Sequence, residues 1–184
     1  AIRKVCTKYD MPLFIDGARL GYALTATGND VTLEDIARIA DVFYIGGTKV
    51  GAMFGEAVVF THGNMPKNFV TLVKQHGALL AKGWLLGVQF DTLFTDNLYC
   101  RIARRANDAA DRIREVLVER GYTLTFDAPT NQIFITLDNE TSERLQRSVR
   151  LGFMEKADDT HTVMRICTSW ATTDEQVEQL IALL

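Results

Sequence analysis

Two charged side chains in this sequence stand directly after short apolar stretches. Asp16 follows residues 13–15, and Lys49 follows residues 42–45 and a Gly-Gly-Thr turn. A carboxylate beside apolar surface is costly unless a cation pairs with it, and a protonated pyridine nitrogen is one cation that fits. A lysine amine that is partly removed from water is a usable nucleophile for a Schiff base. Taken singly, Asp16 could simply cap the turn after a strand, and Lys49 could be a solvated surface charge. Together they predict a site in which Asp16 holds a ring and Lys49 holds its aldehyde.

The stretch between these two residues predicts how they meet. Residues 32–40 place apolar side chains on one face at helical spacing, with Thr32 as the N-cap and Asp35 in the first turn. A strand–helix–strand unit is a right-handed crossover whose two strands pair in parallel. Open α/β sheets bind ligands at the carboxyl ends of such strands. We therefore expect Asp16 and Lys49 to lie at the same edge of one sheet.

Two arginines are candidates for binding a carboxylate ligand. Arg19 lies three residues after Asp16, and Arg165 lies inside the strand-like stretch 163–168. The guanidinium group presents a planar fork of donors that matches a carboxylate. Each arginine also has a simpler interpretation. Arg19 could pair with a local carboxylate, and the head of Arg165 could reach solvent along its own stem.

Other residues that often carry chemistry form weaker patterns here. His62 lies in a turn and His161 lies in an expected loop beside Asp158, while His76 precedes a glycine from which it could approach the site. No two histidines have the spacing of metal ligands, and the glycines form no phosphate-binding fingerprint. We expect neither a metal site nor a nucleotide site.

The rest of the chain predicts an α/β protein in two parts. Residues 1–9 and 18–27 are expected as short helices, residues 56–60 as an antiparallel strand, residues 65–90 as one or two helices, and residues 93–120 as a long helix. After that helix, strands are expected at 122–126, 132–137 and 163–168, and helices at 140–150 and 173–184. We predict a larger domain over 1–100, with a mostly parallel sheet, and a small α+β domain over 101–184.

Composition limits the partners that this chain can have. Of 184 residues, 47% are hydrophobic and 23% are charged, and the formal net charge of −3 gives no electrostatic case for binding nucleic acid or an anionic membrane. No apolar run approaches the roughly 18 residues of a membrane span. Three scattered cysteines, Cys6, Cys100 and Cys167, predict buried free thiols and a cytoplasmic protein.

Four segments of the sequence resemble a known family. They are residues 14–20 (FIDGARL), 47–51 (GTKVG), 74–83 (KQHGALLAKG) and 164–170 (MRICTSW). In this order they are similar to the low-specificity L-threonine aldolases of the β-eliminating lyase family, which are fold type I pyridoxal-phosphate enzymes. The aspartate–lysine pair alone is shared with many such enzymes, so it indicates the superfamily better than the reaction.

The resemblance implies a cofactor, a reaction and roles for five residues. Asp16 would bind the pyridine nitrogen of pyridoxal 5'-phosphate, Lys49 would form the Schiff base, and Thr48 would contact the cofactor. Arg19 and Arg165 would clamp the α-carboxylate of the substrate. The implied reaction is cleavage of a β-hydroxy-α-amino acid, such as threonine or allo-threonine, to glycine and an aldehyde. A homodimer or homotetramer is implied as well.

The resemblance also leaves alternatives open. In this family the phosphate-binding loop, the residue stacked on the ring and the histidines near the substrate hydroxyl come from an earlier half, so we expect this sequence to be roughly the C-terminal half of such an enzyme. Trp84 stands where a basic residue is expected. The alternatives are another fold type I enzyme, which eliminates or transaminates, and a catalytically incomplete fragment.

Overall fold

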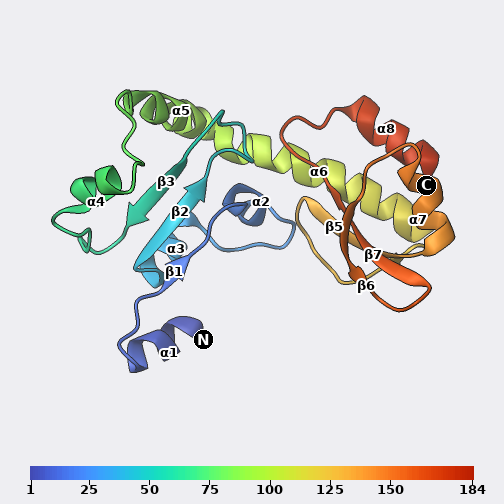
Figure 1. The fold of residues 1–184 in the computed structure, drawn as a ribbon, viewed down its shortest axis with the longest axis horizontal. Coiled ribbons are helices and arrows are strands. Elements are labelled where there is room, and N and C mark those ends of the chain that lie inside the picture. Colours follow the sequence, from blue (N-terminus) through green and yellow to red (C-terminus); the bar gives the residue numbers. More distant parts are fainter. The chain divides into compact units, whose positions relative to one another are not determined.

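The computed structural model describes residues 1–184 and divides them into two compact units, most of whose residues are drawn from blue to green and from yellow-green to red in Figure 1. The first unit comprises residues 1–24 and 29–99, and the second comprises residues 25–28 and 100–184. The division falls close to residue 100. The assignment of these units to the large and small domains of an aldolase stays a prediction.

The first unit contains a three-stranded sheet with the strand order β1-β2-β3. Its elements are α1 (Ile2–Lys8), β1 (Phe14–Ile15), α2 (Leu20–Leu24), α3 (Leu33–Ile39), β2 (Val42–Gly46), β3 (Glu56–Phe60), α4 (Phe69–Gln75) and α5 (Trp84–Phe94). The predicted parallel pairing of β1 with β2 and the antiparallel pairing of β3 are confirmed. The predicted cap of α3 is confirmed too, because the Thr32 hydroxyl accepts a hydrogen bond from the Asp35 amide at 3.2 Å.

The second unit contains an antiparallel four-stranded sheet with the order β4-β5-β7-β6. Its elements are most of α6 (Leu98–Glu119), β4 (Thr123–Leu124), β5 (Gln132–Asp138), α7 (Asn139–Gln146), β6 (Gly152–Lys156), β7 (His161–Cys167) and α8 (Asp174–Leu183). Its core is formed by buried side chains of α6, β5, β7 and α8 together with their neighbours. They include Ala110, Ile113, Leu117, Ile133, Ile135, Leu137, Leu145, Leu151, Met164, Ile166, Val177 and Leu180.

The structure differs from the expected secondary structure in three places. The long helix begins at Leu98 rather than near Leu93, because Asp96 and Asn97 have positive φ angles of 50° and 57° that interrupt it. Strand β6 was missed because it is an edge strand with mostly exposed residues and therefore lacks an apolar alternation. His161 lies at the start of β7 rather than in a loop.

The three cysteines differ in how far they are exposed to solvent. All three cysteines are free, but only Cys6 is buried, whereas Cys100 is partly exposed and Cys167 is exposed. The expectation that all three thiols are buried was therefore wrong. None of the helices combines the length and the apolar character that crossing a membrane requires.

Candidate active site

Asp16 occupies the turn that directly follows β1. Its Oδ1 atom accepts two hydrogen bonds, one from the Tyr44 hydroxyl and one from the Ala18 amide at 3.0 Å, while its Oδ2 atom accepts none. Both bonds favour the ionised form, so the pKa of Asp16 lies below its usual value, with the Tyr44 bond as the largest cause and the charge of Lys49 as a smaller one. The exposed carboxylate is therefore held ionised, with one oxygen available to a ligand.

Tyr44 is a part of the site that sequence reasoning missed. Its hydrogen bond to Asp16, its partial burial and the nearby carboxylates raise the pKa of Tyr44 to about 12, so its hydroxyl stays a donor at neutral pH. No local sequence pattern indicated this contact, because it depends on the register between β1 and β2. Ile15 lies opposite Phe43 in that register, and one further step along both strands sets Asp16 beside Tyr44.

Lys49 occupies the turn that follows β2, and its side chain is exposed. The backbone around it is fixed on both sides, because Tyr22 donates a hydrogen bond to the Lys49 carbonyl and the next residue, Val50, is fully buried. The positive charge of Lys49 helps to lower the pKa of Asp16, which means that the two charges act on one another. The expected partial removal of Lys49 from water is not provided by the residues of this chain.

The residues before Lys49 are held by a glutamate that sequence reasoning also missed. The Gly47 amide donates to Glu56 Oε2 at 2.5 Å, and the Thr48 hydroxyl donates to Glu56 Oε1 at 3.1 Å. Thr48 thus has a partner within the protein, in addition to the contact with a cofactor that was predicted for it. The signal for Glu56 was its place at the start of a strand that pairs back onto β2.

Glycines permit the two turns to approach each other closely. A Cβ atom on Gly17 would lie 1.8 Å from the Tyr44 carbonyl oxygen, and one on Gly46 would lie 2.5 Å from the Ala18 carbonyl oxygen. The Gly46 amide instead donates to the Gly17 carbonyl at 2.9 Å. Any side chain at either position would push the Asp16 turn away from β2.

The two predicted arginines both have unused donors. Arg19 is half-buried and takes part in none of the ion pairs of the chain, so the local ion-pair interpretation is not realised. Arg165 lies on β7 in the second unit, where its Nη1 atom donates to Gln132 Oε1 at 3.2 Å. Its Nε atom is buried without a hydrogen-bond partner. A buried donor of this kind is normally satisfied by a ligand or water.

None of the three histidines makes a hydrogen bond or an ion pair with Asp16, Tyr44, Lys49 or Glu56. His76 is exposed at the end of α4, where its Nδ1 atom contacts the Leu72 carbonyl at 2.9 Å. No group of three or more histidine, cysteine, aspartate or glutamate side chains is placed to hold a metal ion.

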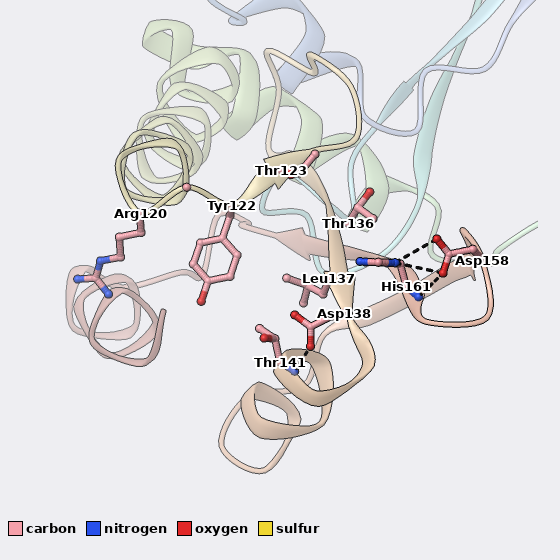
Figure 2. A pocket seen from close by; sticks show the side chains of 10 residues that line it. Arg120, Tyr122, Thr123, Thr136, Leu137, Asp138, Thr141, Asp158 and His161 are labelled. Atoms are coloured by element: carbon pink, nitrogen blue, oxygen red, sulfur yellow. Dashed lines mark hydrogen bonds and ion pairs between the residues drawn. The ribbon is translucent and has the colours of Figure 1, made fainter.

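A pocket of about 560 Å³ lies in the second unit, beside His161 (Figure 2). Its charged groups already have partners within the protein. Asp158 pairs with His161 at 3.0 Å, Asp138 caps α7 by accepting from the Thr141 amide at 2.8 Å, and Arg120 donates to the Ile181 carbonyl at 2.8 Å. Since each of these charged side chains already has a hydrogen-bond partner within the protein, we place the candidate site at the edge of the first sheet.

Comparison with known proteins shows which family this sequence resembles. Residues 1–140 match the model of the β-eliminating lyase family. The low-specificity L-threonine aldolase of Pseudomonas aeruginosa is 28% identical over 181 residues, and that of a second Pseudomonas strain is 27% identical over 183 residues. These matches cover 98% and 99% of this chain but 51% and 52% of the relatives. The chain therefore spans about half the length of the curated relatives it matches.

Solved structures confirm the predicted fold class. A threonine aldolase from Leishmania major superposes with a TM-score of 0.94 at 40% identity, covering 99% of this chain and 53% of that one. A serine palmitoyltransferase from Sphingomonas wittichii has a TM-score of 0.67 at 17% identity over 99% of this chain and 48% of that one, which shows the fold alone. The α/β fold of the fold type I pyridoxal-phosphate enzymes is confirmed, as is the resemblance to threonine aldolases.

Proposed function

We propose that this chain, which belongs to the β-eliminating lyase family, carries ring-binding, aldehyde-binding and carboxylate-binding residues of a pyridoxal 5'-phosphate-dependent aldolase. The proposed reaction cleaves a β-hydroxy-α-amino acid into glycine and an aldehyde, which is acetaldehyde when the substrate is threonine or allo-threonine. Support comes from the names of the curated relatives and of the Leishmania major structure.

The observation that carries the proposal is the pairing of two turns at one sheet edge. Strands β1 and β2 run in parallel, and the turns that follow them contain Asp16 and Lys49. Asp16 commits one oxygen to Tyr44 and Ala18 and leaves the other unpaired. A carboxylate that stays ionised and has one free oxygen is suited to a cationic N–H group.

The residues present fit pyridoxal 5'-phosphate. The free Oδ2 atom of Asp16 would accept the ring N–H, and the exposed amine of Lys49 would hold the aldehyde. Thr48, next to that lysine, would contact the cofactor through the lone pairs that its bond to Glu56 leaves unused. When bound, this cofactor supplies an electron sink for the charge released as the bond between Cα and Cβ breaks.

The arginines account for the carboxylate of the substrate. Arg165 has a buried Nε donor without a partner, and Arg19 has no ion pair, so both guanidinium groups have donors left for a carboxylate. We propose that they bind and orient the α-carboxylate of the amino acid. Holding that group fixes which bond at Cα is broken, because it sets the orientation of the remaining substituents.

The first experiment measures the visible absorbance of the full-length protein after it is mixed with pyridoxal 5'-phosphate. We expect a visible band that Lys49→Ala abolishes and that the matched surface variant Lys67→Ala retains. The products formed from threonine and from allo-threonine then identify the reaction. Glycine with acetaldehyde supports the aldolase, whereas ammonia with a keto acid would assign the chain to an eliminating or transaminating enzyme. No band in the wild type would refute the cofactor proposal.

We also propose that the protein is a homodimer or homotetramer of the cytoplasm. The assembly is supported by the many large apolar side chains that the first unit leaves exposed, among them Trp84, Leu85 and Val88 on α5. Light scattering of the purified protein measures the assembly directly. A monomer at micromolar concentration would contradict it.

A further inference from the structure

The side chain of Glu56 is bound entirely to the turn that precedes Lys49. One carboxylate oxygen accepts from the Gly47 amide at 2.5 Å, and the other accepts from the Thr48 hydroxyl at 3.1 Å. The two bonds reach two consecutive residues of the turn. Glu56 is solvent-exposed, so these bonds do not arise from a need to bury its charge.

The sheet determines that Glu56 reaches this turn. Glu56 is the first residue of β3 and lies opposite Gly46, the last residue of β2. An antiparallel pair places such residues directly across from each other, so the Glu56 side chain starts beside the point where the chain leaves β2. Gly47 lacks a side chain there, and a Cβ atom on it would lie 2.7 Å from the Gly55 carbonyl oxygen.

The other contacts of the turn are made through its backbone carbonyls. The Val50 and Ala52 amides both donate to the Gly47 carbonyl, at 2.9 and 3.0 Å, and Val50 is fully buried. Tyr22 donates to the Lys49 carbonyl. These contacts are made to the carbonyls of Gly47 and Lys49, whereas Glu56 binds the Gly47 amide and the Thr48 hydroxyl.

We infer that Glu56 is a positioning residue that fixes the turn presenting the Lys49 amine, an inference that rests on the proposed function of Lys49. Glu56 lies seven residues after Lys49 and acts through Gly47 and Thr48, without contact with the reacting atoms. A misplacement of about 1 Å in a reacting group can lower a rate by roughly 100-fold. A clamp on this turn therefore contributes to the reactivity of Lys49 as well as to folding.

Three variants of the full-length protein separate these roles. Glu56→Ala removes both bonds, and Glu56→Gln keeps one acceptor oxygen while removing the charge. Glu34→Ala, at an exposed glutamate in the first turn of α3, is the matched control. The thermal midpoint of each variant reports whether the fold itself is weakened.

The first measurement is amide hydrogen exchange at Gly47, whose backbone N–H donates to Glu56, without added cofactor. We expect exchange at Gly47 to be faster by roughly 10- to 100-fold in Glu56→Ala, because the bond from this amide to a charged acceptor is lost, with an intermediate effect in Glu56→Gln and none in Glu34→Ala. Unchanged exchange in Glu56→Ala would contradict the inference that Glu56 fixes this turn. This result does not depend on the proposed function.

The second measurement is the rate at which pyridoxal 5'-phosphate becomes attached to Lys49, trapped by borohydride and read by mass spectrometry. We expect Glu56→Ala to slow attachment and to lower kcat by about 10- to 100-fold with a smaller change in KM. Faster exchange with unchanged attachment would overturn the positioning role. A wild-type protein that takes up no cofactor would refute the proposed function, and with it the role of Glu56 toward Lys49, while the exchange data would still decide the clamp.

Discussion

The two units of the molecule hold their proposed functional residues in different ways. In the first unit, Asp16 and Lys49 lie on turns at the end of a small sheet. In the second unit, Arg165 lies within β7, an interior strand paired on both sides, where it faces Phe134 of β5 and Gly152 of β6. A residue inside a sheet is oriented by the hydrogen bonds of its own backbone. A residue on a turn needs other groups to orient it.

The two units also differ in how completely they bury their large apolar side chains. The second unit encloses a core drawn from α6, β5, β7 and α8, with Leu117 and Ile135 completely buried. Most of the large apolar side chains that are exposed in this chain belong to the first unit. We infer that the second unit provides a firm frame for one arginine, while the reactive groups of the first unit depend on individual hydrogen bonds from Tyr44 and Glu56.

The largest effect is expected from the reactive turn of the first unit. Lys49→Ala removes the amine that we propose holds the aldehyde, so we expect turnover to fall by about 1,000-fold or more. Steady-state cleavage of threonine measures the loss. Lys49→Arg is the matched variant, because it keeps the charge that acts on Asp16 but cannot hold an aldehyde. Activity retained in either variant would remove Lys49 from the mechanism.

The second prediction tests how much the buried core of the second unit contributes to stability. Ile135→Ala removes a completely buried side chain from the centre of β5. We expect this change to lower the free energy of unfolding by about 2–5 kcal/mol. Val58→Ala, on the exposed side of β3, is expected to change it by no more than about 0.5 kcal/mol. Urea denaturation measures both values. Equal losses would contradict the contrast between the two units.

The third effect concerns the arginine that the sheet orients. Arg165→Ala removes a charged donor, so we expect KM for the amino acid to rise by about 10- to 100-fold with a smaller change in kcat. Arg165→Lys keeps the charge but lacks the planar fork, and it should recover only part of the affinity. Unchanged kinetics in Arg165→Ala would exclude Arg165 from the carboxylate clamp.

The smallest effect tests the hydrogen bond that orients Asp16. Tyr44→Phe removes the largest cause of the lowered pKa of Asp16, so that pKa should rise toward its usual value. The Asp16 carboxylate is ionised above its pKa and loses its charge as pH falls through it. As the pH is lowered, cofactor binding should therefore begin to weaken at a higher pH in Tyr44→Phe than in the wild type.

The loss of this one hydrogen bond should weaken binding of pyridoxal 5'-phosphate by about three- to tenfold at neutral pH. Carbon-13 NMR of the Asp16 carboxyl, titrated without cofactor, reports the pKa itself. An unshifted pKa in Tyr44→Phe would show that the Ala18 amide and the charge of Lys49 are sufficient to keep Asp16 ionised.

Part of the site could be predicted from local sequence patterns. Apolar runs that end in Asp16 and in Lys49, with a capped helix between them, specify a parallel crossover, because strand order and handedness follow from chain geometry. The helix cap at Thr32 was predictable because the Asp35 that completes it lies only three residues away in the sequence. The edge strand β6 gave no such pattern, because none of its residues is fully buried.

The fold class, the parallel crossover and the residue types proposed to hold a ring, an aldehyde and a carboxylate all follow from local patterns in the chain. The groups that orient these residues are set by the pairing of strands in the folded protein. Tyr44 reaches Asp16 across 28 positions of the chain and Glu56 reaches Gly47 across nine, and each bond depends on the register between two strands. The physical reason is that hydrophobic periodicity reports which face of a strand is buried, whereas a side-chain hydrogen bond depends on which residue stands opposite.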